Sequence, residues 1–195
     1  MLFELRTYEL QPGRALEYLD LFRTMGVERV TKYLPMGGYW LTDSGRLNTI
    51  HHLWIYQSIA ERAECRAEFA ADKPWTEEFV PKAFPLIQRQ QTAFLALETG
   101  SPELDAAIDR RKKEIPAQRM GERIFADGLL RLSVSRAPMP RDPVAVVADW
   151  MVISGEGVGS CVRLERVTGD EALKAPTESL ERSELLRPLA ISPIV

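Results

Sequence analysis

The stretch from Asn48 to Tyr56 (NTIHHLWIY) alternates as a β-strand does, and it holds both histidines of the chain. Every second side chain of a strand points to the same face of its sheet. One face is therefore aromatic with polar tips, and the other is aliphatic with one histidine. The first face carries Ile50, His52, Trp54 and Tyr56, and the second carries His51, Leu53 and Ile55. A strand of this kind must be covered on both sides.

Length and composition limit the class of protein. A chain of 195 residues forms one large or two small domains, and 45% hydrophobic with 27% charged residues is typical of a soluble globular protein. A net charge of -3 gives no electrostatic signature of nucleic-acid binding. Early charges such as Glu4 and Arg6 argue against a signal peptide, and no apolar run is long enough to span a membrane. We expect a cytoplasmic protein with no membrane or nucleic-acid partner.

The first half of the chain predicts the element order β-α-β-β-α-β. Ser58 and Glu61 match a capping box at the start of the second helical region. The predicted strands are 2–10, 39–42, 48–56 and 86–97, and the predicted helical segments are 14–31, 58–71 and 72–79. This order is that of the ferredoxin-like fold, with four antiparallel strands and the helices on one face.

The two faces of that sheet differ in character. We expect the helices to cover the aliphatic face, on which Phe3, Leu5, Leu53 and Ile55 lie. The other face would then stay open, and it carries Arg6, Tyr8, Trp40, His52, Trp54 and Tyr56. Aromatic patches of this size are usually interaction surfaces. A second sheet, from the rest of this chain or from another chain, should therefore pack on the aromatic face.

Three stretches in the first half resemble the NIPSNAP family over about residues 1–98: FELRTYELQPGRALEYLDLF, then GYW followed by LNTIHHLWIYQSIAER, and DKPWTEEFVPKAFPLIQRQ. The family is similar to the dimeric α/β-barrel superfamily, in which two ferredoxin-like sheets face each other. That superfamily includes cofactor-independent monooxygenases, haem-degrading enzymes and proteins without an established activity. The resemblance implies a fold and a mode of pairing, because a shared fold does not imply a shared reaction.

The second half predicts a linker helix over 99–121 and a degenerate second ferredoxin-like domain over 122–195. Within it we expect strands at 128–136 and 160–168, a further strand at 185–194, and a helix from Asp142 to Met151. The expected fold is α+β, a dimeric α/β barrel built as a tandem pseudo-repeat with a shortened second half. We favour closure of the barrel within one chain, followed by homodimerisation.

His52 is the candidate catalytic residue, with Arg6 beside it. An imidazole can act as an acid or base near neutral pH, or ligate haem iron, and Arg6 could hold an anionic oxygen. Alternatively, His52 could be a hydrogen-bonded core residue, the interpretation that we favour, and Arg6 could be part of an ion pair. The candidate ligand-binding residues are Tyr8, Trp40, Trp54 and Tyr56, which could instead form an interface between two sheets. His51 is interpreted as a packing residue, and we expect no metal and no cofactor.

The function predicted from these features is binding of a hydrophobic small molecule inside the barrel. One alternative is a cofactor-independent monooxygenase-like or haem-binding enzyme that uses His52. Another is a structural or interaction protein with a filled barrel. A cavity of ~300 Å³ or more beside His52 would favour binding, whereas a solid aromatic core there would argue against both sets of site residues.

Overall fold

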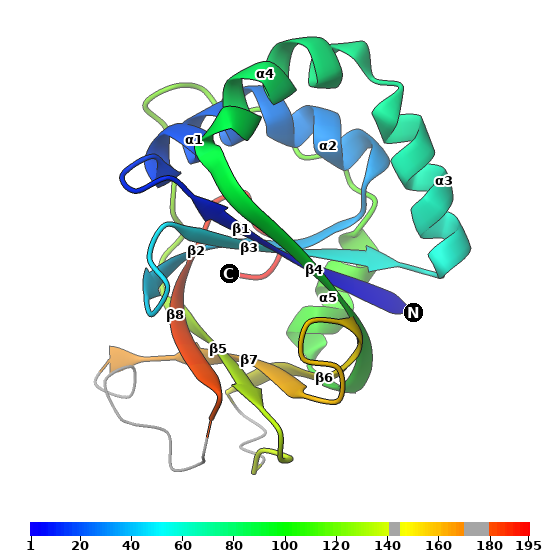
Figure 1. Ribbon diagram of the computed structural model, residues 1–195, viewed down its shortest axis with the longest axis vertical. Coiled ribbons are helices and arrows are strands. Elements are labelled where there is room, and N and C mark those ends of the chain that lie inside the picture. The colour runs from blue at the N-terminus through cyan, green and yellow to red at the C-terminus, as the bar shows by residue number, and fades with distance from the viewer. Residues whose placement is uncertain (141–144, 170–179) are drawn as a thin grey trace.

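In a computed structural model of the protein, which describes residues 1–140, 145–169 and 180–195, one antiparallel sheet closes into a barrel within the single chain (Figure 1). The strand order around the barrel is β1-β3-β2-β8-β5-β7-β6-β4. The strands are β1 (Leu2–Leu10), β2 (Met36–Ser44), β3 (Thr49–Tyr56), β4 (Ile87–Gly100), β5 (Leu129–Ser135), β6 (Val146–Gly155), β7 (Cys161–Val167) and β8 (Arg182–Pro188). The expected closure of the barrel by the second half of the chain is confirmed.

The predicted element order of the first half is confirmed. Its helical segments are α1 (Ala15–Leu21), the π-helical turn η1 (Phe22–Gly26), α2 (Val27–Tyr33), α3 (Ile59–Ala70), the π-helical turn η2 (Pro74–Phe79), α4 (Val80–Ala83) and the short 3-10 turn η3 (Phe84–Leu86). The capping box forms, since the N–H of Glu61 donates to Ser58 Oγ at 3.1 Å and the N–H of Gln57 donates to the Glu61 carboxylate. Register then places Arg6 opposite His52 across β1 and β3.

Helices α1–α4 cover the outer face of β1–β4, and the second-half strands face the inner side of that sheet (Figure 1). Two hydrophobic cores result. The barrel core contains Phe3, Leu5, Trp40, Leu53 and Ile55, together with the inward-facing residues of β4–β8. The helix-side core contains Tyr8, Tyr39, Ile50, Trp54 and Tyr56, packed against the helical residues.

The predicted orientation of the sheet is therefore wrong. The aromatic face meets the helices, and the aliphatic face lines the barrel. Every residue of β3 is buried, so its alternation marks two faces without telling which of them is covered by helices. The aromatic face finds aromatic partners in the helical layer: Phe22 stacks on Tyr39 with ring centroids 4.2 Å apart. Trp40 is the exception in the predicted set, because it lies inside the barrel.

The second half differs from its prediction in one element. Residues 146–155 form strand β6 in place of the predicted helix at 142–151, and residues 142–144 of that prediction lie outside the described residues. Pairing with β4 on one side and β7 on the other overrides the helical spacing of the apolar residues. The second-half strands β5, β6 and β7 are polar on the outer side of the barrel. There Arg163 pairs with Asp149 at 2.7 Å, and Arg131 pairs with Glu165 at 3.3 Å.

One end of the barrel is filled. The linker helix α5 (Pro102–Arg110), shorter than predicted, contacts β2, β4 and β6 and adds Leu104 to the barrel core. Trp40 and Trp150 occupy the interior near it, leaving a void of only about 10 Å³. The Trp40 ring lies against Gly38, where any side chain would collide with the indole. Any ligand site inside the barrel must therefore lie toward the opposite end.

Candidate functional site

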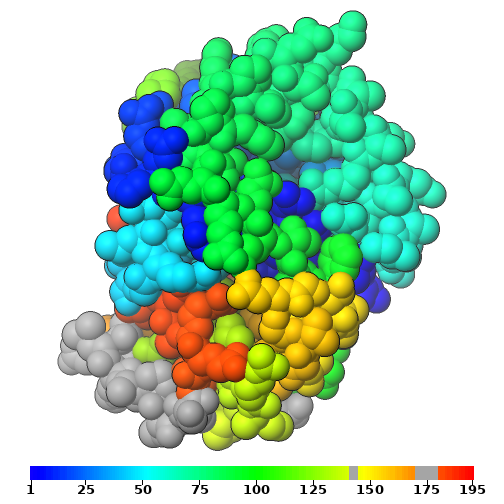
Figure 2. Space-filling view, in the orientation of Figure 1, coloured from blue at the N-terminus to red at the C-terminus, as the bar shows by residue number. Residues whose placement is uncertain are grey.

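The opposite end of the barrel opens into a cavity of about 280 Å³, which we call the mouth cavity. Its apolar wall consists of Leu5, Ala93, Leu95, Val134, Val152 and Val162. Its polar lining consists of Thr7, Gln91, Thr92, Arg136, Glu156, Ser160, Glu181 and Arg182, with Gly157. On the face shown in Figure 2, β4 (green), the β6–β7 loop (yellow) and the start of β8 (orange-red) meet around this end. The cavity combines an apolar interior with a charged rim, as small-molecule sites do.

A chain of three hydrogen-bonded side chains runs through the wall of the mouth cavity. Thr7 Oγ1 lies 3.0 Å from Nδ1 of His51, and Nε2 of the same ring lies 3.0 Å from Oε2 of Glu184. Thr7 lines the cavity, while His51 and Glu184 are fully buried behind it. Cross-strand pairing of β1 with β3 sets Thr7 opposite His51. We call these residues the Thr7–His51–Glu184 chain.

The protonation of this chain follows from its chemistry. Burial alone would raise the pKa of Glu184, but the hydrogen bond from His51 and the hydrogen bond and positive charge of Arg46 outweigh burial and lower it, so the carboxylate is ionised. Burial lowers the pKa of His51 and outweighs the opposing effect of Glu184. A neutral imidazole beside a carboxylate donates its Nε2–H, which leaves Nδ1 as an acceptor for the Thr7 hydroxyl.

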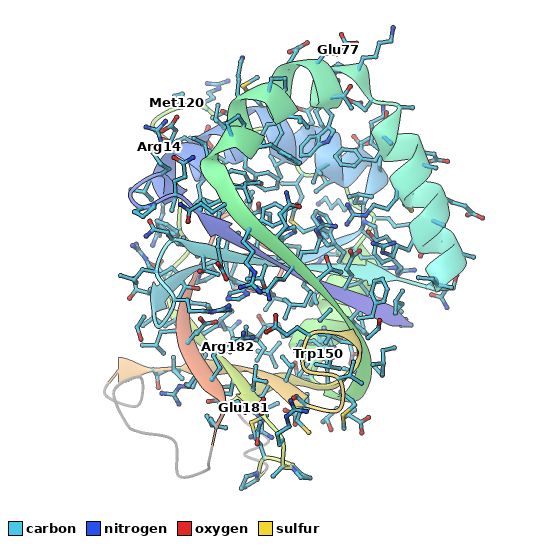
Figure 3. The ribbon with its side chains drawn as sticks, viewed as in Figure 1. Arg14, Glu77, Met120, Trp150, Glu181 and Arg182 are labelled. Atoms are coloured by element: carbon cyan, nitrogen blue, oxygen red, sulfur yellow. The ribbon has the colours of Figure 1, made fainter. Side chains whose placement is uncertain are left out.

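Two arginines hold Glu184 in place. Arg46 Nε donates to Glu184 Oε1 at 2.8 Å, and Arg182 Nε lies 3.5 Å from Oε2. Figure 3 labels Arg182 at the start of β8, the strand of the barrel that pairs with β2 on one side and with β5 on the other. Because Arg182 also lines the cavity, the mouth carries a cation near the end of the Thr7–His51–Glu184 chain.

His52, the predicted catalytic residue, lies on the other side of β3. Its Nδ1 accepts a hydrogen bond from Trp54 Nε1 at 2.8 Å, and its ring packs against Tyr8 and Tyr39 with centroids 4.6 and 4.9 Å away. Its exposed fraction is 3%, and it lines neither the mouth cavity nor the small void near Trp40. Burial and the nearby charge of Arg6 hold the pKa of His52 well below its usual range. The predicted position of His52 in a barrel cavity is wrong.

Arg6 joins a different network on the helix side. The buried carboxylate of Glu4 accepts from Arg62 Nε at 2.9 Å, from Arg66 at 3.2 Å and from Arg6 at 3.4 Å. Burial alone would raise the pKa of Glu4, but the hydrogen bond from Arg62 and the three positive charges lower it. Arg6 also donates to the hydroxyl of Tyr8 at 3.2 Å. The network contains the Glu4–Arg6 ion pair of the alternative interpretation, but it joins β1 to α3 on the helix side and does not lie within the barrel as expected.

The structure thus separates the residues predicted to form one site. Arg6, Tyr8, His52, Trp54 and Tyr56 lie together under the helices, and Trp40 lies in the filled part of the barrel. The Thr7–His51–Glu184 chain was not predicted. Alternation already places Thr7 and His51 on the same face of two neighbouring strands, so their contact could have been inferred. Glu184 lies 133 residues beyond His51, and no local sequence pattern predicts the contact between them.

A second hollow, of about 410 Å³, lies between the linker and the C-terminal segment. Met36, Ile115 and Ile191 are among its lining residues. It is larger than the mouth cavity, and none of the residues of the Thr7–His51–Glu184 chain is in its lining. Among the described residues there is no group of three or more histidine, cysteine and acidic side chains placed to hold a metal ion. None of the helices that the structure describes is long and apolar enough to cross a membrane.

Fold and cavity together define a class of protein: a single-chain α/β barrel with helices on one side and a ligand-sized opening at one end. The sequence model of the NIPSNAP family matches residues 3–102, just over half of the chain. The chain belongs to the NIPSNAP family, which confirms the resemblance of the first half. The activity of this family is not established, so membership alone assigns no reaction to the chain.

Curated relatives match the first half of the chain. NipSnap homolog 3A of Homo sapiens is 36% identical over 91 residues, which are 46% of this chain and 36% of the relative. The NipSnap protein of Drosophila melanogaster is 32% identical over 101 residues, covering 52% of this chain and 36% of that protein. The chain thus spans little more than a third of these relatives.

Solved structures extend the comparison. An uncharacterised NIPSNAP domain protein from Burkholderia xenovorans superposes with a TM-score of 0.50 at 34% identity, over 52% of this chain and 99% of that one. An anthrone oxidase-like protein superposes with a TM-score of 0.52 over 96% of this chain and 90% of that one, at 8% identity. At such low identity the second match shows the shared fold of the whole barrel and nothing about chemistry.

Proposed function

We propose that this protein binds a small molecule with an apolar body in the mouth cavity. The observation that carries the proposal is the contrast between the two ends of one barrel. The end near α5 is filled to a void of about 10 Å³, whereas the mouth keeps about 280 Å³ against an apolar wall. This volume lies just below the range of about 300–1,000 Å³ that is usual for small-molecule pockets, and the lining joins an apolar wall to polar and charged groups that could orient a ligand.

Anilinonaphthalene sulfonate is a suitable probe, because it joins an aromatic body to an anion and fluoresces when it leaves water. The test compares wild type with Val134→Phe, which places a ring in the mouth cavity. Ile59→Trp is the matched control, since Ile59 is exposed at the start of α3 and does not line the cavity. We expect Val134→Phe to weaken binding at least tenfold and Ile59→Trp to leave it unchanged. Equal binding by all three folded proteins would contradict the proposal.

The enzyme alternatives that depend on His52 receive less support from its surroundings. A general acid or base must reach its substrate, and a haem ligand must reach iron, yet His52 is packed between Tyr8, Tyr39 and Trp54. Haem titration is the direct check: a Soret band in wild type that is lost in His52→Ala would restore that alternative. The other alternative is a structural or interaction protein with a filled barrel. Failure of every probe to bind in the mouth cavity would favour it.

We also propose that the second half, residues 122–195, is a degenerate copy of the ferredoxin-like domain in the first half. The repeated strand order supports it: β4-β1-β3-β2 in the first half corresponds to β8-β5-β7-β6 in the second.

Homodimerisation, the predicted partner interaction, is tested by sedimentation equilibrium. A mass of twice the 22.1 kDa chain is expected, and a mass of one chain at every concentration would refute it.

A further inference from the structure

We propose that the mouth cavity selects ligands that carry a hydrogen-bond donor, specifically a hydroxyl group on an apolar or aromatic body, and that Thr7 is the residue that reads this donor. The inference rests on the proposed binding function and names the class of ligand. It follows from the direction in which protons are held along the Thr7–His51–Glu184 chain.

The direction starts at Glu184. An ionised carboxylate can only accept hydrogen bonds, so His51 must present Nε2–H to Oε2, 3.0 Å away. The neutral ring then carries a lone pair on Nδ1, and the Thr7 hydroxyl, 3.0 Å from that atom, donates its proton to it. The proton of Thr7 is thus directed away from the cavity.

A hydroxyl whose proton is committed in this way offers only its oxygen lone pairs to a ligand. A ligand group that reaches Thr7 Oγ1 must therefore donate, as an alcohol or a phenol does. A ligand that presents an ether or carbonyl oxygen at this point would place two acceptors against each other. Buried donors and acceptors without partners are costly, so such a chain discriminates between ligands of the same shape.

The surrounding charges agree with this preference. Arg182 lines the cavity and lies 3.5 Å from Glu184, and Arg46 holds the other carboxylate oxygen at 2.8 Å. Both cations keep Glu184 ionised and therefore keep the chain oriented. The cavity lining itself carries both signs of charge, since Glu156 and Glu181 accompany Arg136 and Arg182, so the discrimination rests on the direction of the chain and not on net charge.

The test compares a naphthol with the fluoronaphthalene that has fluorine at the same carbon, which matches its shape but lacks the donor. Dissociation constants come from displacement of anilinonaphthalene sulfonate. Hydrogen bonding to Thr7 should make the preference for naphthol about fivefold to tenfold larger in wild type than in Thr7→Val. Thr7→Ser, which keeps the hydroxyl, should retain the preference.

Thr42→Val is the matched control, because Thr42 is a buried threonine of β2 that does not line the mouth cavity. It should leave the preference unchanged. If Thr7→Val is poorly folded, the comparison of Thr7→Ser with Thr7→Ala serves in its place, with the same expected difference. Equal preference in wild type and in the folded variants lacking the hydroxyl would overturn this inference while leaving binding intact. Failure of both naphthalenes and the fluorescent probe to bind at all would instead refute the proposed function, and the inference with it.

Discussion

His51 and His52 are consecutive residues, yet their rings lie in different cores on opposite sides of β3. Nε2 of His51 lies 3.0 Å from Glu184 inside the barrel, and Nδ1 of His52 accepts from Trp54 at 2.8 Å beneath the helices. The His51 ring lies behind Thr7, which lines the mouth cavity, whereas the His52 ring is enclosed by aromatic side chains. The two histidines should therefore respond differently to substitution and to ligand.

Replacing His52 should affect stability and not ligand binding. His52→Ala removes a buried ring from between Tyr8 and Tyr39 and leaves Trp54 Nε1 without its acceptor. By analogy with other large-to-small core changes, we expect a loss of about 3 kcal/mol in the free energy of unfolding. Urea denaturation measures this loss, and probe titration of the folded variant should give an unchanged dissociation constant. Wild-type stability, or a loss of binding alone, would contradict the core assignment.

The pKa values of both histidines are lowered in the folded protein, which fixes the sign of a pH dependence. Below the ordinary histidine pKa of about 6.5, the unfolded chain takes up protons that the folded chain does not, so stability falls as the pH falls. Each histidine contributes at most about 1.4 kcal/mol per pH unit. In unfolding experiments between pH 7 and pH 5, His52→Phe should show a shallower slope than wild type. Identical slopes would show that His52 titrates normally.

The Glu4 network should be essential for docking α3 on the sheet. Glu4 is fully buried and accepts from Arg62 at 2.9 Å, so its removal leaves several arginines without their acceptor. Breaking a buried ion pair by removing one partner typically costs about 3–5 kcal/mol, and because Arg62 is partly exposed we expect the lower end for Glu4→Ala. Glu68→Gln, on the exposed side of α3, should change stability by less than about 0.5 kcal/mol. Equal effects of the two changes in thermal unfolding would contradict this role.

Glu184→Gln should reverse the proton direction along the chain to Thr7. Arg46 needs an acceptor at the position of Oε1, so the amide oxygen of the new side chain should stay there and its NH₂ group should face His51 Nε2. The ring must then carry its proton on Nδ1. Nitrogen-15 spectra of the imidazole distinguish the two tautomers, and the variant should show the Nδ1–H form where wild type shows Nε2–H. The same tautomer in both proteins would argue against an ionised, accepting Glu184.

Local patterns were sufficient for the order of the elements in the first half, but not for which face of the sheet the helices cover. The capping box at Ser58, the alternation of the strands and the turns between them are set by neighbouring residues, and each is found as predicted. The segment around Val147 and Met151 has apolar residues at helical spacing, but it pairs with β4 and β7 as a strand. Its conformation is decided by partners distant in sequence, which a single-segment pattern does not contain.

The site was harder to predict than the fold for a related reason. A strand such as β3 that is buried on both faces shows alternation without direction, so the choice between His51 and His52 could not be made from that strand alone. It depends on what each face meets: the core that contains Phe22 of η1 and Phe79 of η2 on one side, and Glu184 from β8 on the other. The contact of Thr7 with His51 was within reach of the sequence, whereas that of His51 with Glu184 was not.

The central claim, that ligand binds on the barrel side of β3 at its mouth, is tested most directly by the two histidines themselves. They are the only histidines in the chain, so a protein labelled with nitrogen-15 at histidine gives two sets of ring signals, which the His52→Phe variant assigns. Titration with anilinonaphthalene sulfonate should shift the signals of His51, which lies directly behind Thr7, and leave those of His52 in place. Shifts of His52 with His51 unchanged would place the ligand under the helices and contradict the account.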